Sequence, residues 1–414
     1  MAVAANQLCL VGDMRFKSEA CLFKERALQG VQRAIFANTL DYGTITTVLM
    51  LCFYDVCTYQ AFSPFLLLCT KLLTASSAKI SDGCDSSWVT HLHGGLNLID
   101  SIQTCQYSSL RSFVTMYFVA HDIMNRTASE GQYRPDDTKI TRNSWLDSDD
   151  LDEIDMLMGC SRQLMNLIDR ISALAAEKRT IIQFIGNGID PTEMADLLEQ
   201  YVDASNELET SLHLLKQKLP AERYHNDSDR NSAACSTDHP IKRIAETKRL
   251  AALLYLRERL DLDEIGGMSS ISIKNNNSSP IICGNQSPNP ASAIEPDQAP
   301  SILPPGAATR QPSKRRLVLS IIDIISTLPD SPTLLWPLFI LGNTGLEDSE
   351  DDRRFVLDRL DRIQKTRNLG SVRRTRLAVQ RAFWKRDLNV DHNPAYGTGG
   401  RVWGDERSRV ISLA

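Results

Sequence analysis

Hydrophobic positions along this chain recur at helical spacing almost throughout. The clearest run covers residues 194–219, where steps of four and three residues alternate. Its positions are Met194, Leu198, Tyr201, Ser205, Leu208, Leu212, Leu215 and Leu219, all but one of them apolar. Such a stripe is typical of an amphipathic helix packed on a core. Asp190, Pro191 and Glu193 predict its start because they suit a cap and a first turn, and Pro220 predicts its end.

A second strong helix is predicted over about 150–178. Its apolar face would hold Ile154, Leu157, Met158, Leu164, Met165, Ile168, Ile171 and Ala175. The acids at 149, 150, 152 and 153 would favour the positive end of its dipole. Weaker periodic runs predict helices over 14–37, 44–59, 64–75, 87–104, 109–127, 241–262, 314–327, 351–366 and 371–387. No stretch alternates with period two, so the fold class predicted is all-α, a large multi-helix domain.

One long segment, residues 266–313, interrupts this pattern. Its 48 residues include 8 Pro, 9 Ser, 5 Asn and 4 Gly, and such a composition buries too little to offset its chain entropy. We therefore predict a disordered insertion there. The predicted organisation is a first helical part over 1–265, the insertion over 266–313, closing helices over 314–390 and a flexible tail over 391–414.

Composition places the chain among globular proteins. It has 414 residues, 42% hydrophobic and 23% charged, with a net charge of −5, which argues against a chain that is wholly a nucleic-acid binder. The ten cysteines are scattered, and most lie in apolar runs, so we expect reduced core residues of an intracellular protein. No uncharged window reaches the roughly 20 residues of a membrane helix, and the first residues lack a targeting pattern, so no membrane partner is expected.

A histidine cluster is the first candidate for chemistry. His91 and His93 form a His-x-His pair, and His121 and Asp122 follow at a distance of about 28 residues. A histidine followed by a His-Asp pair in a helical protein resembles metal-dependent phosphohydrolases of the HD superfamily, in which these residues hold an ion that activates water. The alternative is that His91 and His121 lie at helix–helix contacts, and we favour it because the pattern needs only common dipeptides.

Other catalytic and binding patterns are weaker. Cys52 and Cys57 are the closest cysteines, with no second pair to complete a zinc site. Nucleophile elbows and phosphate-binding glycine motifs do not occur. The eight acids of 136–155 lie at a predicted helix start in a polar setting, which argues against a role in general acid/base catalysis. We therefore predict no catalytic, cofactor-binding or metal-binding residues and no cofactor in this chain.

The segment 353–386 is strongly basic. It holds twelve basic residues against Asp358 and Asp361, so a nucleic-acid or acidic-partner surface is one reading. The other reading is a helix face with internal salt bridges. Asp358–Arg362 and Asp361–Lys365 would be favourable i,i+4 pairs, with a buried stripe at positions 356, 360 and 363 opposite.

Several short motifs, taken in order, resemble the fungal-specific transcription factor regulatory domain, the helical middle-homology region that follows the binuclear zinc cluster of fungal regulators. They are Trp88-x-x-His91-Leu92-x-Gly94-x-x-x-Leu98-Ile99, Phe113-x-x-x-Tyr117-Phe118-x-x-His121-Asp122-Ile123-Met124, Ile154-Asp155-x-Leu157-Met158-Gly159-Cys160-Ser161, Leu253-Leu254-Tyr255-Leu256-x-x-Arg259, Leu335-Trp336-Pro337-Leu338-Phe339-Ile340-x-Gly342, Arg367-Asn368-Leu369-Gly370-x-Val372 and Phe383-Trp384. The similarity spans about 10–390.

The resemblance implies an all-α regulatory domain that controls transcription in the nucleus, of a metabolic or secondary-metabolite pathway, without catalysis. It implies that His91 and His121 serve packing. Expected partners are other transcription-factor chains or co-regulators and a small-molecule effector, for which a pocket lined by Trp88 and Trp336 is one guess. The Cys-x2-Cys-x6-Cys DNA reader of such regulators is missing from this sequence. We therefore expect zinc only if an upstream six-cysteine cluster belongs to this protein, and DNA contact either through that cluster or indirectly, by pairing with another factor.

Overall fold

The structure is a computed structural model that describes residues 1–10, 12–57, 87–101, 108–128, 145, 151–186, 191–220, 239–261, 310–344, 346, 349–367 and 369–387. Its helices are α1 (Ala2–Leu10), α2 (Lys17–Phe36), α3 (Tyr42–Cys57), α5 (Ser87–Ser101), α6 (Ser108–Ala128), α8 (Arg162–Gly186), α9 (Pro191–Leu214), α10 (Pro240–Arg259), α12 (Arg310–Thr327), α13 (Leu335–Asn343), α14 (Glu350–Arg367) and α15 (Gly370–Asp387). Two 3-10 turns, Met14–Phe16 and Pro332–Leu334, precede α2 and α13. The predicted all-α class is confirmed.

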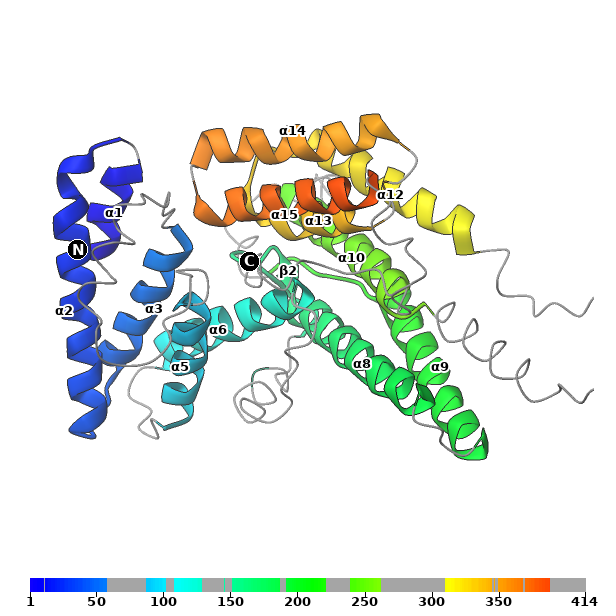
Figure 1. Ribbon diagram of the computed structural model, residues 1–414, viewed down its shortest axis with the longest axis horizontal. Helices are drawn as coiled ribbons and strands as arrows, with labels where there is room; N and C mark the ends of the chain where they lie inside the picture. Colours follow the sequence, from blue (N-terminus) through cyan, green and yellow to red (C-terminus); the bar gives the residue numbers. More distant parts are fainter. Residues whose placement is uncertain are drawn as a thin grey trace, which may run out of the picture.

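The helices pack in three groups (Figure 1), with one large core and a small separate cluster of Ala5, Ala20 and Tyr54 between α1, α2 and α3. Helices α1, α2 and α3 lie side by side at one end, and α5 and α6 join them to the middle of the molecule. The antiparallel pair α8 and α9 extends away from the centre, with α10 packed along it. Helices α12 to α15 form a layer that meets the rest through α10 and α13.

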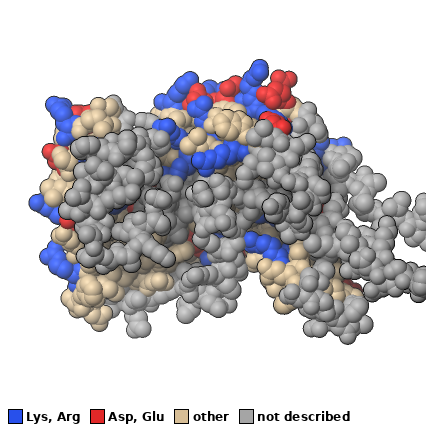
Figure 2. Space-filling view, viewed as in Figure 1, with Lys and Arg blue, Asp and Glu red and all other residues tan. Residues whose placement is uncertain are grey.

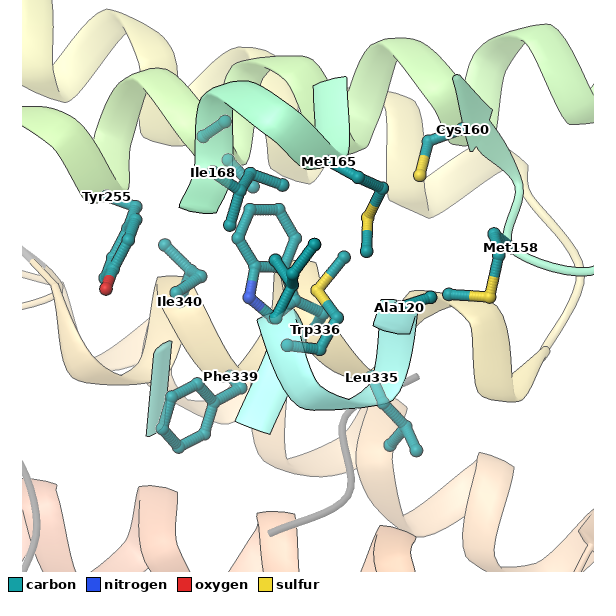
Figure 3. Packing of buried hydrophobic residues seen from close by; sticks show 14 of the residues in the cluster. Ala120, Met158, Cys160, Met165, Ile168, Tyr255, Leu335, Trp336, Phe339 and Ile340 are labelled. Atoms are coloured by element: carbon teal, nitrogen blue, oxygen red, sulfur yellow. The ribbon is translucent and has the colours of Figure 1, made fainter. Parts of the chain in front are cut away.

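Trp336 of α13 lies at the centre of this core. Its indole is surrounded by Met165 and Ile168 of α8 and by Ile340 of its own helix (Figure 3). Every residue of α13 is buried, which explains why this helix has no polar face. Burial of an indole together with aliphatic side chains from several helices is a large favourable term in folding.

The predicted helix over 150–178 is wrong in its first third. Residues 154–155 and 160–161 instead form β1 (Ile154–Asp155) and β2 (Cys160–Ser161), a short antiparallel pair, and α8 begins only at Arg162. The Asp155 carboxylate accepts the backbone N–H groups of Leu157 and Met158, both at 2.9 Å, and Gly159 has a φ of +63°. These local bonds favour a turn over a helix. Leu157, expected in the core, is exposed.

Other boundaries lie close to their predictions. Helix α9 begins at Pro191 as expected but ends at Leu214, six residues before Pro220, because Lys218 pairs with the backbone of Asp152 and Ile154. Helix α12 starts at Arg310, inside the last residues of the predicted insertion. The predicted helix over 64–75, residues 266–309 and the predicted tail over 391–414 lie outside the described residues. None of the helices that the structure describes is long and apolar enough to cross a membrane.

Candidate functional site

His121 and Asp122 are neighbours on α6 and face different surroundings. The His121 ring donates from Nδ1 to the carbonyl oxygen of Tyr117 at 2.8 Å, and the two rings lie 3.8 Å apart between centroids. Burial lowers the pKa of His121 to about 4, with a smaller contribution from the Lys248 charge, while the bond to Tyr117 opposes the shift. A neutral, packed imidazole is therefore the form present at neutral pH.

The Asp122 carboxylate is held by an arginine and faces a histidine, so it is not open to a metal. One Asp122 oxygen accepts from Arg126 at 2.5 Å, and the other lies 3.4 Å from Nε2 of His93. Arg126 also lies 3.7 Å from Asp169 of α8, so this cluster links α5, α6 and α8. His93 and Asp122 were both predicted as candidate metal ligands, and the structure does bring them together. However, Arg126 lies between the carboxylates of Asp122 and Asp169.

His91 belongs to a separate cluster. Its Nε2 lies 3.4 Å from Asp55 of α3, and Lys24 of α2 donates to the other oxygen of that carboxylate at 2.6 Å. The cluster joins α2, α3 and α5 across a nearly buried acid. His91 and His121 are thus engaged in different helix contacts and do not converge on one ion.

Metal-ligand geometry is not found in the part of the chain that is described. No group of three or more His, Cys, Asp or Glu side chains there is arranged to hold an ion. Cys52 is buried, and burial, with a smaller contribution from Asp55, raises the pKa of its thiol. The side chain of Cys57 lies outside the described residues. A buried thiol of raised pKa has little thiolate with which to act as nucleophile or ligand.

Polar contacts also fix the central core. The Trp336 indole N–H donates to Thr127 Oγ1 at 2.9 Å, and that hydroxyl donates to the Met124 carbonyl at 2.7 Å. Tyr255 packs edge-on against Trp336 at 6.5 Å, with its hydroxyl 3.1 Å from Ser172 Oγ. These bonds satisfy buried polar groups and define one packing arrangement of α6, α8, α10 and α13.

One buried group was missed by the sequence analysis. Lys248 of α10 is only 1% exposed, and its ammonium donates to the carbonyl of Met158 at 2.5 Å. Burial lowers the pKa of Lys248, while Cys160 and Asp155 nearby act in the opposite direction. No short motif marks such a lysine, because its partner is a backbone carbonyl 90 residues away. It fastens the β1–β2 turn onto α10.

The basic segment becomes the helical hairpin of α14 and α15. Asp330 pairs with Arg359 and Arg362, and Asp361 pairs with Lys365 and Arg376. The predicted Asp361–Lys365 pair is confirmed, whereas Arg362 turns to Asp330 instead of Asp358. The buried stripe at 356, 360 and 363 is confirmed, each of these side chains being fully buried.

A hollow of about 300 Å³ lies elsewhere, between α1, α2 and α3, lined by Phe23, Met50, Leu51 and neighbouring residues. Trp336 is fully buried in the core and does not line it. The side chain of Trp88 lies outside the described residues, so a pocket between these two tryptophans stays a prediction.

Comparison with known proteins matches the sequence to one family. No curated protein and no solved structure matches the chain. A family model described as the fungal-specific transcription factor domain matches residues 1–396, nearly the whole chain. The chain therefore belongs to the family of fungal-specific transcription factor domains, and its role lies in the regulation of transcription.

Proposed function

We propose that this chain is a non-catalytic regulatory domain that acts in the nucleus, through packing contacts with partner chains or an effector rather than through chemistry on a substrate. A metabolic or secondary-metabolite pathway is the proposed target, and DNA is reached through a zinc cluster on this or an associated chain. The observation that supports the absence of catalysis is the engagement of Asp122 by Arg126 and His93. A carboxylate neutralised in this way is a poor metal ligand or general base.

A reporter assay tests the regulatory role. The chain is fused to a heterologous DNA-binding domain and tethered upstream of a reporter gene in a fungal host. We expect reporter output to change several-fold relative to the DNA-binding domain alone. A Trp336→Ala variant should lose this effect because its core is disrupted, while exposed Arg354→Gln on α14 should keep it. An unchanged reporter with both the wild-type chain and its variants contradicts the proposal.

Metal analysis tests the absence of catalysis. The HD-type alternative requires an ion held by His121, Asp122 and His91 or His93. We expect purified protein to contain no stoichiometric manganese, iron or magnesium and to hydrolyse no nucleoside phosphate when these ions are added. Stoichiometric metal that disappears in His121→Ala would overturn the proposal in favour of a phosphohydrolase.

A further inference from the structure

Helix α15 has two chemically different faces. Its inner face consists of Val372, Thr375, Val379 and Phe383, all buried against the rest of the fold. Its outer face consists of Arg373, Leu377, Arg381 and Trp384, all exposed. The spacing of this second set is four, four and three residues, so these side chains form one stripe on the opposite side of the helix. We call it the outer stripe.

The apolar members of the outer stripe are exposed although they are large. Trp384 is 70% exposed and Leu377 is 40% exposed. The adjacent Phe383, in contrast, is buried with the Arg353 guanidinium 5.4 Å from its ring centre. An exposed tryptophan one turn away from an exposed arginine is the composition of a binding hot spot, in which Trp and Arg are enriched.

The charge around the outer stripe is mostly positive. Helix α15 holds six basic residues and a single acid, Asp387, which is paired with Arg353 of α14. Figure 2 shows Lys and Arg side chains gathered over the α14–α15 hairpin, with acidic ones between them along the upper edge. Arg381 has no ion-pair partner among the residues that the structure describes. An acidic partner would therefore gain charge complementarity here.

We infer that the outer stripe of α15 binds an acidic amphipathic helix of another protein, whose bulky apolar residues cover Leu377 and Trp384 and whose carboxylates meet Arg373 and Arg381. The stripe extends over about 16 Å, roughly three helical turns, which matches a partner segment of about twelve residues. A second copy of this chain fits poorly, because it would bring a second set of six basic residues to the contact with only Asp387, already paired with Arg353, as an acid. The inference does not depend on the proposed function, since binding is measured on the purified chain.

Nucleic acid fits this surface less well. Five basic side chains of the hairpin, Arg353, Arg359, Arg362, Lys365 and Arg376, are already paired with aspartates of the fold. Phosphate binding draws on several free cations at once, and it gives no role to Leu377 between two arginines. A peptide helix uses both the apolar and the cationic members of the stripe.

The test uses the full chain and a fluorescein-labelled synthetic peptide of about fifteen residues. The peptide carries Leu and Phe on one helical face and Asp and Glu elsewhere, and a control peptide has the same composition with the apolar residues scattered around the helix. Fluorescence anisotropy at physiological salt should show saturable micromolar binding of the first peptide and at least about tenfold weaker binding of the second.

Two variants with matched controls locate the site. Trp384→Ala should weaken binding at least about tenfold. The control Leu319→Ala, which truncates an exposed apolar side chain of α12 outside the stripe, should change binding less than twofold. Arg381→Glu should weaken it about fivefold or more, while Arg354→Glu on α14 should not. Circular dichroism confirms that each variant is folded.

Three results would overturn the inference. The first is no saturable binding of the amphipathic peptide, and the second is equal affinity for both peptides. The third is duplex DNA that binds more tightly than the peptide, displaces it and loses affinity steeply with added salt, because the hairpin would then be a phosphate-binding surface.

Discussion

Two adjacent glycines in α5 give a sharp test of how the helices pack. A Cβ atom built on Gly95 would lie 2.5 Å from Cζ of Phe118 and 2.7 and 2.8 Å from its two Cε atoms. Phe118 of α6 is fully buried, so its ring cannot move aside without displacing the core. A Cβ built on Gly94 meets nothing within 4 Å. The two positions lie in the same helix with the same intrinsic helix propensity, and they differ in burial and in this contact.

We expect alanine to have opposite effects at these positions. Gly94→Ala should raise the free energy of unfolding by about 0.5–1 kcal/mol, because alanine restricts the unfolded chain and favours the helix. Gly95→Ala gains the same stabilisation from helix propensity, but forcing a methyl group against the Phe118 ring costs about 1–3 kcal/mol. The net effect should be destabilisation of up to about 2.5 kcal/mol.

Urea denaturation of the two variants, followed by circular dichroism, measures these free energies. A double-mutant cycle with Phe118→Leu isolates the contact, because shortening the side chain removes the ring atoms nearest to Gly95. The cost of Gly95→Ala should shrink in that background. A Gly95→Ala variant as stable as Gly94→Ala would show that α5 and α6 do not approach each other this closely.

Three further predictions concern buried polar groups. The folded-state pKa of His121 is about 4, below the ordinary 6.5. The contribution of the neutral imidazole to the free energy of unfolding should therefore be fully present above about pH 6.5 and fall as the pH drops toward 4. His121→Gln should reduce this pH dependence, measured by urea denaturation, by up to about 3 kcal/mol. Arg126→Ala should destabilise the fold by about 3 kcal/mol in the same assay, because it removes the closest cation from the buried Asp122, and equal stability would refute this. Iodoacetamide should alkylate exposed Cys21 well before Cys52, whose thiol pKa is raised by burial, as mass spectrometry of the folded protein would show.

Most helices could be predicted from the sequence, because periodicity, prolines and charges act within a few residues of each other. The closing helices show this best, since α12 ends at Thr327 and α15 spans 370–387, as the pattern indicated. The failure at 150–161 has a local cause as well. Asp155 and Gly159 favour a turn, yet the apolar residues around them keep helical spacing, and periodicity alone gave the wrong structure.

Contacts between distant residues account for what the sequence could not predict at the candidate site. The pairing of His91 with Asp55, and that of His93 with Asp122, depends on how α3, α5 and α6 pack, and no spacing rule contains that information. The ion pair of Arg362 could not be predicted from the sequence for the same reason. Arg362 has Asp358 within one helical turn, but the approach of Asp330 from another segment decides its partner.

The hydrogen bond between Trp336 and Thr127 joins side chains 209 residues apart in the chain. The helices on either side of the predicted insertion therefore share a single interior and cannot be separated into autonomous modules. A protease cut between residues 266 and 309 should leave two fragments that stay associated and copurify, and co-expression of those fragments should restore a soluble complex that neither piece forms alone.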